Sequence, residues 1–556
     1  MIGLISATAA GAAARDRLAA AWPDRTRVYE GAAGDAVRAA FAECGQLVCF
    51  LATGAVVRLV APLLTDKGSD PGVVCVDESG RFAVSLVGGH GGGANDLARE
   101  VGEVLGASPV VTTATDSAGV PGLDTLGLPV EGAVPAVSRA LLDGEPVALD
   151  AEVPWPLPPL PVAPRGAYTI RLTDRVVDLS EREVVLRPPS LVVGVGASRN
   201  APVDEVLGLV DSTLREAGLS PRSIAELATV DAKADEPGIV AAAERLGVPL
   251  VTHPAEELAR VAVPNPSDAP LAAVGTPSVA EASALVRGGE LLVPKRKSAM
   301  VTCAVARRPG RGRLAVVGLG PGARDLLTPR AAAELRRASV LVGLDQYVAQ
   351  IRDLLRPGTR VLESGLGAEE ERARTAVDEA RRGYAVALIG SGDAGVYAMA
   401  SPALAEAGDD IDVVGVPGVT AALAAGAVLG APLGHDHVSI SLSDLHTPWE
   451  VIERRVRAAA EADIVVTFYN PRSRGRDWQL PRALRILAGH RSPGTPVGVV
   501  RNASRADESS RLTTLAALDP ATVDMMTVVT VGNTATRQIA GRMVTPRGYR
   551  WQEETR

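Results

Sequence analysis

The chain has few cysteines and few aromatic residues, and each shortage argues against a class of protein. Aromatic side chains make up only 3% of its 556 residues, whereas small aliphatic residues and glycine dominate, which favours layered α/β domains over a β-sandwich. The cysteines have neither the spacing of a zinc site nor the density of a disulfide scaffold. We therefore expect free, buried thiols at Cys44, Cys49, Cys75 and Cys303.

Concentrated positive charge and long apolar runs are missing as well. The formal net charge of −8 is mild for this length and leaves no basic footprint for nucleic acid or for a membrane surface. No apolar run reaches the length of a membrane span, and no charged segment precedes the first apolar residues as it does in an export signal. We therefore expect a soluble cytoplasmic protein that binds neither nucleic acid nor membranes.

A strand that runs into a glycine-rich turn divides the chain near its middle. Residues 314–317 are uninterrupted and apolar, as in a buried parallel strand, and residues 318–322 then supply three glycines. The turn satisfies the relaxed G-x-G-x-x-A fingerprint, so a dinucleotide-dependent oxidoreductase is one hypothesis. That fingerprint needs a helix directly after the glycines. The first good helix start is Thr328 followed by Pro329, which weakens the hypothesis.

Before this point, short apolar strands alternate with alanine-rich helices. Residues 2–6 and 46–52 read as strands that are each followed by a helical pattern. This order predicts a parallel sheet, whose ligands bind at the carboxyl ends of the strands. A second such unit begins near residue 191. Six prolines among residues 154–164 exclude a helix or a central strand between the two units.

Two loops of the first half carry candidate chemistry. Residues 88–95 place five glycines around His90 and end on Asn95, which indicates a backbone cradle that presents both side chains to a ligand. A flexible turn is the alternative, and Asn95 could equally cap a helix that begins near Asp96. Asp116 follows a strand expected at 110–113, and it is either a catalytic carboxylate or a turn residue.

Taken in order, the motifs of the first half resemble the cobalt-precorrin-5A hydrolase family of cobalamin biosynthesis, over about residues 1–308. The motifs are residues 67–71, 85–95, 112–116, 231–237, 274–282 and 293–305. The resemblance implies that water opens a ring-A lactone and that acetaldehyde is released, which requires a general base and an oxyanion stabiliser. On this basis His90 is the candidate base, and Lys67 or the glycine-loop N–H groups would hold the oxyanion. Asp116 would orient or relay, and Asn95 is a further candidate contact.

Two more glycine-rich segments follow in the second half, a loop at residues 390–397 and a strand with its loop at 413–421. Three such loops in one domain predict a cleft lined by backbone N–H and C=O groups. Because the glycine loops lack lysine and arginine, the cleft suits a zwitterionic nucleoside better than a plain phosphate. Later strands that end in polar residues predict a second α/β layer, and a large substrate would bind between the layers.

This half resembles the tetrapyrrole methylases, and most closely the precorrin-3B or cobalt-factor III C17-methyltransferases, over about residues 313–550. The matching motifs are residues 318–322, 391–397, 417–421, 439–445, 468–471 and 531–533. The resemblance implies S-adenosylmethionine as the cofactor. The residues that would contact it are Pro321, Gly392, Asp393, Val396, Thr420 and Ala421. Ala394 stands where the family often has proline, a change that should stiffen the loop less but keep its backbone contacts.

The implied reaction adds a methyl group at C17 and contracts the macrocycle. It needs alignment and one proton transfer, for which Asp345 and Ser443 are candidates by their positions at loop ends, although a structural role is the alternative for each. Pairing with a hydrolase of this type favours a cobalt-loaded macrocycle, so any metal would belong to the substrate and we expect no metal site of the protein's own. The family also implies a homodimer formed through the methylase half.

We therefore expect a multidomain α/β protein, with two small α/β domains in the hydrolase half followed by a two-lobed methylase. The expected divisions are a hydrolase N-terminal domain (1–130), a middle or linker region with the proline-rich strap (131–188), a hydrolase C-terminal domain (189–308), and the N-terminal and C-terminal lobes of the methylase (313–428 and 436–550). Besides the oxidoreductase, the alternative to a bifunctional enzyme of corrin biosynthesis is a tetrapyrrole carrier or sensor without catalysis.

Overall fold

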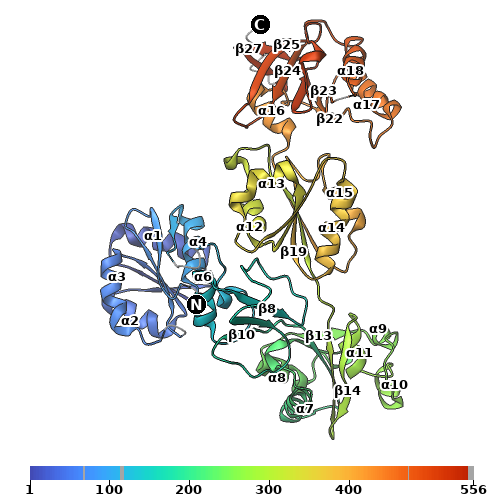
Figure 1. Ribbon diagram of the computed structural model, residues 1–556. Coiled ribbons are helices and arrows are strands. Elements are labelled where there is room, and N and C mark those ends of the chain that lie inside the picture. The colour runs from blue at the N-terminus through green and yellow to red at the C-terminus, as the bar shows by residue number, and fades with distance from the viewer. Residues whose placement is uncertain (67–68, 90, 113–117, 474, 549–556) are drawn as a thin grey trace. The chain divides into compact units, whose positions relative to one another are not determined.

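The computed structural model describes residues 1–66, 69–89, 91–112, 118–473 and 475–548 (Figure 1). They divide into two compact units. The first unit is Met1–Gly310 with Arg356–Gly358. The second is Arg311–Leu355 with the described part of Thr359–Arg556. Within the described ranges, no helix combines the length and the apolar character needed to cross a membrane. The predicted multidomain α/β class is confirmed.

The first unit begins with a six-stranded sheet in the order β2-β1-β3-β4-β5-β6, in which β2, β1, β3 and β4 run parallel. Side chains alternate between its faces, so Leu4 packs under α1 and α4 whereas Ile5 packs under α2 and α3. The predicted parallel arrangement is therefore confirmed for these four strands, whereas β5 runs antiparallel to β4. Its elements are β1 (Ile2–Ser6), α1 (Ala9–Ala21), β2 (Thr26–Tyr29), α2 (Ala33–Glu43), β3 (Gln46–Phe50), α3 (Thr53–Val60), β4 (Gly72–Val76), β5 (Phe82–Val87), α4 (Ala94–Leu105) and β6 (Ser108–Val110).

A second sheet, of order β7-β10-β9-β8, follows with a core of its own. The proline-rich residues 154–164 contain neither a helix nor a strand, as predicted. They do not merely connect, because Leu157 and Leu160 from this stretch are buried in that core. The elements are β7 (Val130–Gly132), α6 (Val134–Asp143), β8 (Val147–Ala151), β9 (Tyr168–Leu172) and β10 (Glu183–Leu186).

The third sheet of this unit has the order β13-β12-β11-β15-β14, with β11, β12 and β13 parallel. Helix α11 packs so closely on β11 that a Cβ atom on Gly194 would lie 1.9 Å from the backbone oxygen of Ala280, so this position requires glycine. The elements are β11 (Leu191–Ala197), α7 (Val203–Glu216), β12 (Ile224–Val230), α8 (Pro237–Leu246), β13 (Leu250–His253), α9 (Ala255–Ala259), α10 (Asp268–Val274), α11 (Ala280–Leu285), β14 (Glu290–Lys297) and β15 (Val301–Arg307).

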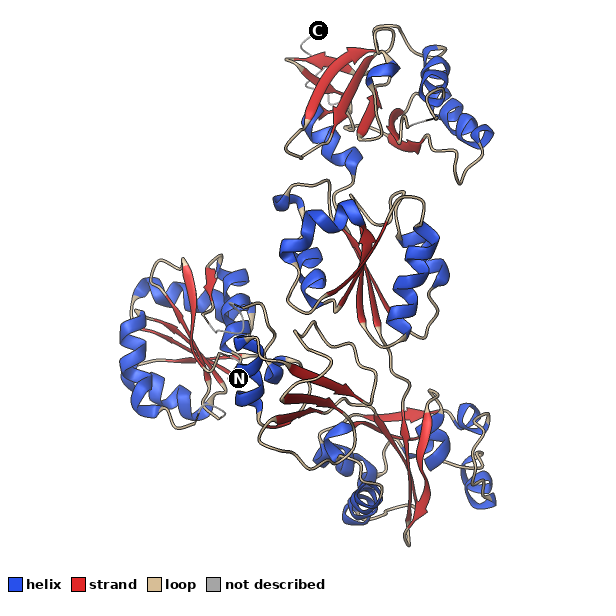
Figure 2. Cartoon of the chain, viewed as in Figure 1, coloured by secondary structure: helices blue, strands red, loops and turns tan. Residues whose placement is uncertain are grey.

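The second unit starts with an all-parallel sheet of order β18-β17-β19-β16-β20, with helices on both faces (Figure 2). The late helix start is confirmed, because Thr328 caps α12 by accepting a hydrogen bond from the backbone N–H of Ala331. The elements are β16 (Arg313–Gly318), α12 (Pro329–Arg337), β17 (Val340–Leu344), α13 (Asp345–Ile351), β18 (Arg360–Ser364), α14 (Glu369–Arg381), β19 (Ala385–Gly390), α15 (Ala400–Glu406), β20 (Asp412–Val416) and α16 (Ala421–Leu429).

A second lobe of this unit has a mixed sheet of order β22-β23-β26-β24-β25 beside a small sheet of β21, β28 and β27. Strands β22 and β23 run parallel, and β26 runs antiparallel to β23 and β24. The elements are β21 (Gly430–Ala431), β22 (His437–Ser441), α17 (Trp449–Glu461), β23 (Val465–Tyr469), α18 (Gln479–Ala488), β24 (Pro496–Arg501), β25 (Ser509–Thr514), β26 (Thr527–Val531), β27 (Arg537–Ile539) and β28 (Arg542–Val544).

Candidate functional site

The three glycine-rich loops of the second unit meet at the carboxyl edge of its parallel sheet. They follow β16, β19 and β20, whose neighbouring positions in the sheet bring the loops side by side. Loops at the carboxyl ends of parallel strands are where such sheets bind ligands. Five of the six residues expected to contact a cofactor lie in these loops, and the sixth, Ala421, begins the helix α16 that follows the third loop; the five are Pro321, Gly392, Asp393, Val396 and Thr420.

These loops touch through their main chains. Gly320 and Gly392 exchange two backbone hydrogen bonds of 2.9 and 2.8 Å. A Cβ atom on Gly318 would lie 2.8 Å from the backbone nitrogen of Gly418, and one on Gly418 would lie 2.2 Å from the backbone oxygen of Gly392. Real Cβ atoms do not approach backbone this closely, so only glycine allows the three loops to form one surface, which we call the glycine cradle.

The Asp393 carboxylate joins two of the loops. Its Oδ1 accepts a hydrogen bond of 2.8 Å from the backbone N–H of Gly395, within its own loop. Its Oδ2 accepts one of 3.0 Å from the backbone N–H of Gly418, in the next loop. Each oxygen keeps a second lone pair for a ligand. The side chain therefore holds the shape of the cradle whatever else it contacts.

Two tyrosines link the second lobe to the cradle, and sequence reasoning missed both. The Tyr469 hydroxyl lies 2.6 Å from the Thr420 hydroxyl and accepts a hydrogen bond of 2.8 Å from the backbone N–H of Ala422. Tyr397 donates to the backbone oxygen of Ser439 at 2.8 Å, and its ring centroid lies 5.3 Å from that of Tyr469. Burial raises the pKa of Tyr469, so its hydroxyl stays protonated. Both tyrosines lie within motifs quoted above, but only the fold shows their contacts.

The two candidates for proton transfer form only local bonds within the described part of the chain. Asp345 is exposed at the carboxyl end of β17, and its Oδ1 accepts a hydrogen bond of 2.6 Å from the backbone N–H of Gln346. Ser443 is half-buried beyond β22, where its backbone N–H donates to Ser441 Oγ at 3.3 Å. Their roles remain predictions.

Three of the four candidates in the first half, Lys67, His90 and Asp116, lie outside the described residues. The fourth, Asn95, is buried and accepts a hydrogen bond of 2.7 Å from Ser85 Oγ. The idea that Asn95 caps a helix is wrong, because α4 begins at Ala94 and its cap position is Gly93, at φ 72°. Strand β6 also ends earlier than expected, since it pairs over only three residues.

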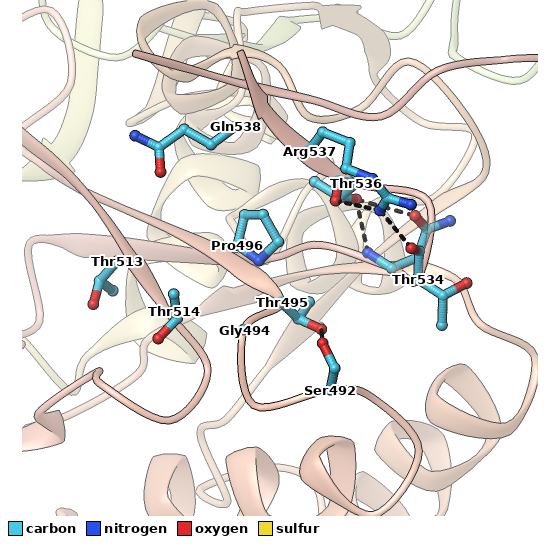
Figure 3. A pocket seen from close by; sticks show the side chains of 11 residues that line it. Ser492, Gly494, Thr495, Pro496, Thr513, Thr514, Thr534, Thr536, Arg537 and Gln538 are labelled. Carbon is cyan, nitrogen blue, oxygen red and sulfur yellow. Dashed lines mark hydrogen bonds between the residues drawn. The ribbon is translucent and has the colours of Figure 1, made fainter. Parts of the chain in front are cut away.

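A polar cavity of about 220 Å³ lies at the other end of the second lobe (Figure 3). Pro496, which begins β24, and Asn533, which follows β26, both line it. Because β26 is antiparallel to β23, this is the edge where β23 begins, opposite its end at Tyr469. Arg537 lies beside it and donates to the backbone oxygens of Thr534 and Thr536. The cavity is therefore separate from the glycine cradle.

The cysteines are not suited to act as nucleophiles near neutral pH. All four are free and buried, as expected. Burial raises the pKa of Cys49 and of Cys303 to about 12, so neither forms a thiolate near neutral pH. Among the described residues, no group of three or more His, Cys, Asp or Glu side chains could hold a metal ion.

A two-lobed α/β unit with a glycine cradle at a parallel strand edge is the architecture expected of the methylases that the second half resembles. Residues 313–519 match the family model described as Tetrapyrrole (Corrin/Porphyrin) Methylases. Residues 35–116 and 191–306 match the models Cobalamin synthesis G N-terminal and Cobalamin synthesis G C-terminus. The chain belongs to the tetrapyrrole methylases, and its first half carries both cobalamin synthesis G regions.

Two curated relatives agree with this assignment, and one solved structure is similar to part of the chain. "Probable cobalt-factor III C(17)-methyltransferase" of Salmonella typhimurium is 47% identical over 239 residues, which are 42% of this chain and 99% of that protein. "Cobalamin biosynthesis protein CobIJ" of Mycobacterium tuberculosis is 42% identical over 270 residues, 47% of this chain and 53% of that protein. A solved structure, "Crystal structure of the methyltransferase CobJ", is 40% identical, with a TM-score of 0.40, over 42% of this chain and 100% of that one.

The predicted fusion of the two families is thereby confirmed. The family match supports neither the non-catalytic carrier nor the dinucleotide-dependent oxidoreductase.

Proposed function

We propose that the second unit transfers a methyl group from S-adenosylmethionine to C17 of cobalt-factor III or precorrin-3B, with contraction of the macrocycle. The observation that carries this proposal is the glycine cradle in a chain of this family. A surface of main-chain N–H and C=O groups without lysine or arginine in its glycine loops fits the uncharged and zwitterionic parts of such a cofactor.

The residues that would hold the cofactor are the six at the cradle, with Asp393 fixing the relative position of two loops. When bound, the cofactor supplies an electrophilic methyl group. The protein's task is then alignment and exclusion of water, because no strong base is needed to activate the methyl group. Asp345 and Ser443 are our candidates for the single proton transfer, since each lies just beyond the end of a strand.

Titration of S-adenosylhomocysteine by calorimetry tests the cofactor site without the macrocycle. We expect the intact chain to bind it and D393A to bind much more weakly, with D393N intermediate because an amide oxygen still accepts one hydrogen bond. D378N is the matched control, since Asp378 lies on α14 and is half exposed. If the intact chain does not bind S-adenosylhomocysteine, the methylase assignment of this chain's activity is wrong.

We also infer that the first unit opens the ring-A lactone of cobalt-precorrin-5A and releases acetaldehyde. Its match to both cobalamin synthesis G regions supports this. His90 is the proposed base, Lys67 or the glycine-loop N–H groups the oxyanion donors, and Asp116 a relay. Acetaldehyde release measured for H90A against wild type tests the first role, with H490A as a control because His490 is an exposed histidine of the other unit. Unchanged release by H90A would remove His90 from the mechanism.

Both proposals treat any cobalt as part of the substrate.

We further propose that the five divisions expected from the sequence are the functional domains and that the methylase half forms a homodimer. Analytical ultracentrifugation of the full chain tests the dimer, and a monomer at micromolar concentration would contradict it.

A further inference from the structure

The loop between β24 and β25, residues 502–508, uses its own acidic side chains to hold its shape. Asn502 has φ 49° and donates through Nδ2 to Asp507 Oδ2 at 2.6 Å. Asp507 also accepts from Arg501 at 3.0 Å. Ser504, at φ 63°, donates its backbone N–H to Glu508 Oε2 at 2.5 Å. Both carboxylates next to Arg505 in sequence are therefore engaged by other groups.

This loop lies against the first loop of the glycine cradle. Ala323 donates its backbone N–H to Ser504 Oγ at 3.2 Å. Arg505 donates from Nε to the backbone oxygen of Pro321 at 3.0 Å. The stem of Arg505 covers Gly322, where a Cβ atom would lie 2.7 Å from Arg505 Cγ. The guanidinium of Arg505 is thus held beside a residue that we expect to contact the cofactor.

The charge of Arg505 has no acidic partner within the described ranges. Its side chain forms the single hydrogen bond to Pro321, which leaves both Nη atoms without an acceptor there. The side chain is only half exposed, so water does not fully replace a partner. The edge formed by the two free Nη atoms of a planar guanidinium matches the geometry of a carboxylate.

Arg372, whose charge also acts on the pKa of Tyr347, has an acceptor at each of its three guanidinium nitrogens. Arg372 is 5% exposed, and it donates to Ser364 Oγ at 3.0 Å and to the backbone oxygen of Gly365 at 2.8 Å. Burial raises the pKa of Tyr347, and the charges of Arg505 and Arg372 act against that rise. Because Arg372 is buried and already bonded, Arg505 is the one of the two with donors to offer a ligand.

We propose that the Arg505 guanidinium binds a carboxylate of a ligand held at the glycine cradle. The inference rests on the proposed methylase function, which offers two sources of that group. One is the amino-acid end of the cofactor, and the other is an acetate or propionate side chain of the tetrapyrrole. In both cases the carboxylate of the ligand pairs with the charge of Arg505, which has no acidic partner within its own loop.

The test compares R505Q and R505K with wild type and with R457Q, a control on α17 whose arginine is exposed and paired with Glu453. Calorimetry measures affinity for S-adenosylhomocysteine and for 5′-methylthioadenosine, which lacks the carboxylate. Steady-state methylation of cobalt-factor III measures kcat and KM. Losing a charge-assisted pair of this kind costs about tenfold or more in affinity.

If the carboxylate is the cofactor's, R505Q weakens S-adenosylhomocysteine about tenfold and leaves 5′-methylthioadenosine unchanged. If it is the tetrapyrrole's, R505Q leaves both unchanged and raises KM about tenfold with little change in kcat. R505K, which keeps the charge but not the planar fork, should recover part of either loss. Circular dichroism checks that the variants fold. If R505Q does not fold, the comparison of R505K with wild type is the test.

The inference is wrong if folded R505Q, or R505K where R505Q unfolds, stays within about twofold of wild type in every measurement. A wild-type chain that neither binds S-adenosylhomocysteine nor methylates is a different result, because it overturns the proposed function and the inference falls with it. If wild type is active and the Arg505 variant is unaffected, the inference is wrong but the proposed function stands.

Discussion

Replacing Gly418 by alanine should disrupt the glycine cradle although it adds a single methyl group. The new Cβ atom would lie 2.2 Å from the backbone oxygen of Gly392 and 2.9 Å from that of Gly318. Both obstacles are main chain, so no side-chain rotation relieves the overlap and the loops themselves must separate. Overpacking of this kind costs about 1–3 kcal/mol. We expect G418A to lower the thermal unfolding midpoint of the second unit.

The same change should weaken S-adenosylhomocysteine by about tenfold or more, because separated loops no longer present their N–H and C=O groups as one surface. The assay is calorimetric titration combined with a thermal unfolding scan. G415A is the matched control, since Gly415 lies near the end of β20, just before the loop that holds Gly418, and a Cβ atom there would meet nothing within 4 Å.

Two results would refute this reasoning. If G418A bound S-adenosylhomocysteine as tightly as wild type, the cradle would not be the cofactor site or would not depend on close approach of the loops. If G415A were as damaging as G418A, the loss would reflect intolerance of any side chain in this strand-and-loop segment and not the contact with Gly392.

Three further predictions concern one hydrogen bond of the second unit and two buried groups of the first unit. Y469F should destabilise the second unit by about 1–3 kcal/mol in thermal unfolding, because the backbone N–H of Ala422 loses its acceptor, and an unchanged midpoint would contradict that. In the first unit, burial acts to raise the pKa of Asp174, but the hydrogen bonds from Arg307 and Ser190 and the nearby positive charges together outweigh it, and the pKa lies below its ordinary value. The stability from this pair should therefore be present above about pH 4 and be lost as pH falls further. D174N should lower the free energy of unfolding by about 3 kcal/mol at neutral pH. Acid unfolding curves of D174N should also depend less on pH than those of wild type. Because burial raises the pKa of Cys49 to about 12, iodoacetamide at pH 8 should label it only after denaturation, as mass spectrometry of peptides can show.

Local patterns predicted much of the architecture because they depend on neighbours in sequence. The apolar run at 314–317 is a central parallel strand, and the Thr328 hydroxyl caps α12 as its position before Pro329 suggested. The glycine-rich loops fall at the carboxyl edge because a strand followed by a helix leaves them there.

Contacts between segments far apart in the sequence could not be predicted from such local patterns. Nothing near Tyr469 indicates that its hydroxyl would meet the start of α16, and Arg505 reaches Pro321 only because β24 ends opposite the first glycine loop. The sheet of β7, β8, β9 and β10 was missed for another reason. Its strands are only three to five residues long, and the prolines that interrupt the stretch at 154–164 still bury two leucines in its core.

The glycine cradle has a consequence for how the gene for this protein tolerates variation. In a saturation mutagenesis screen, codons 318 and 418 should each reject every replacement, although they are far apart in the sequence. Second-site suppressors should not arise at the other codon, because each already encodes the smallest residue and the colliding atoms are main chain. Two uncorrelated, invariant codons would thus mark a single physical contact that methods based on paired substitutions cannot detect.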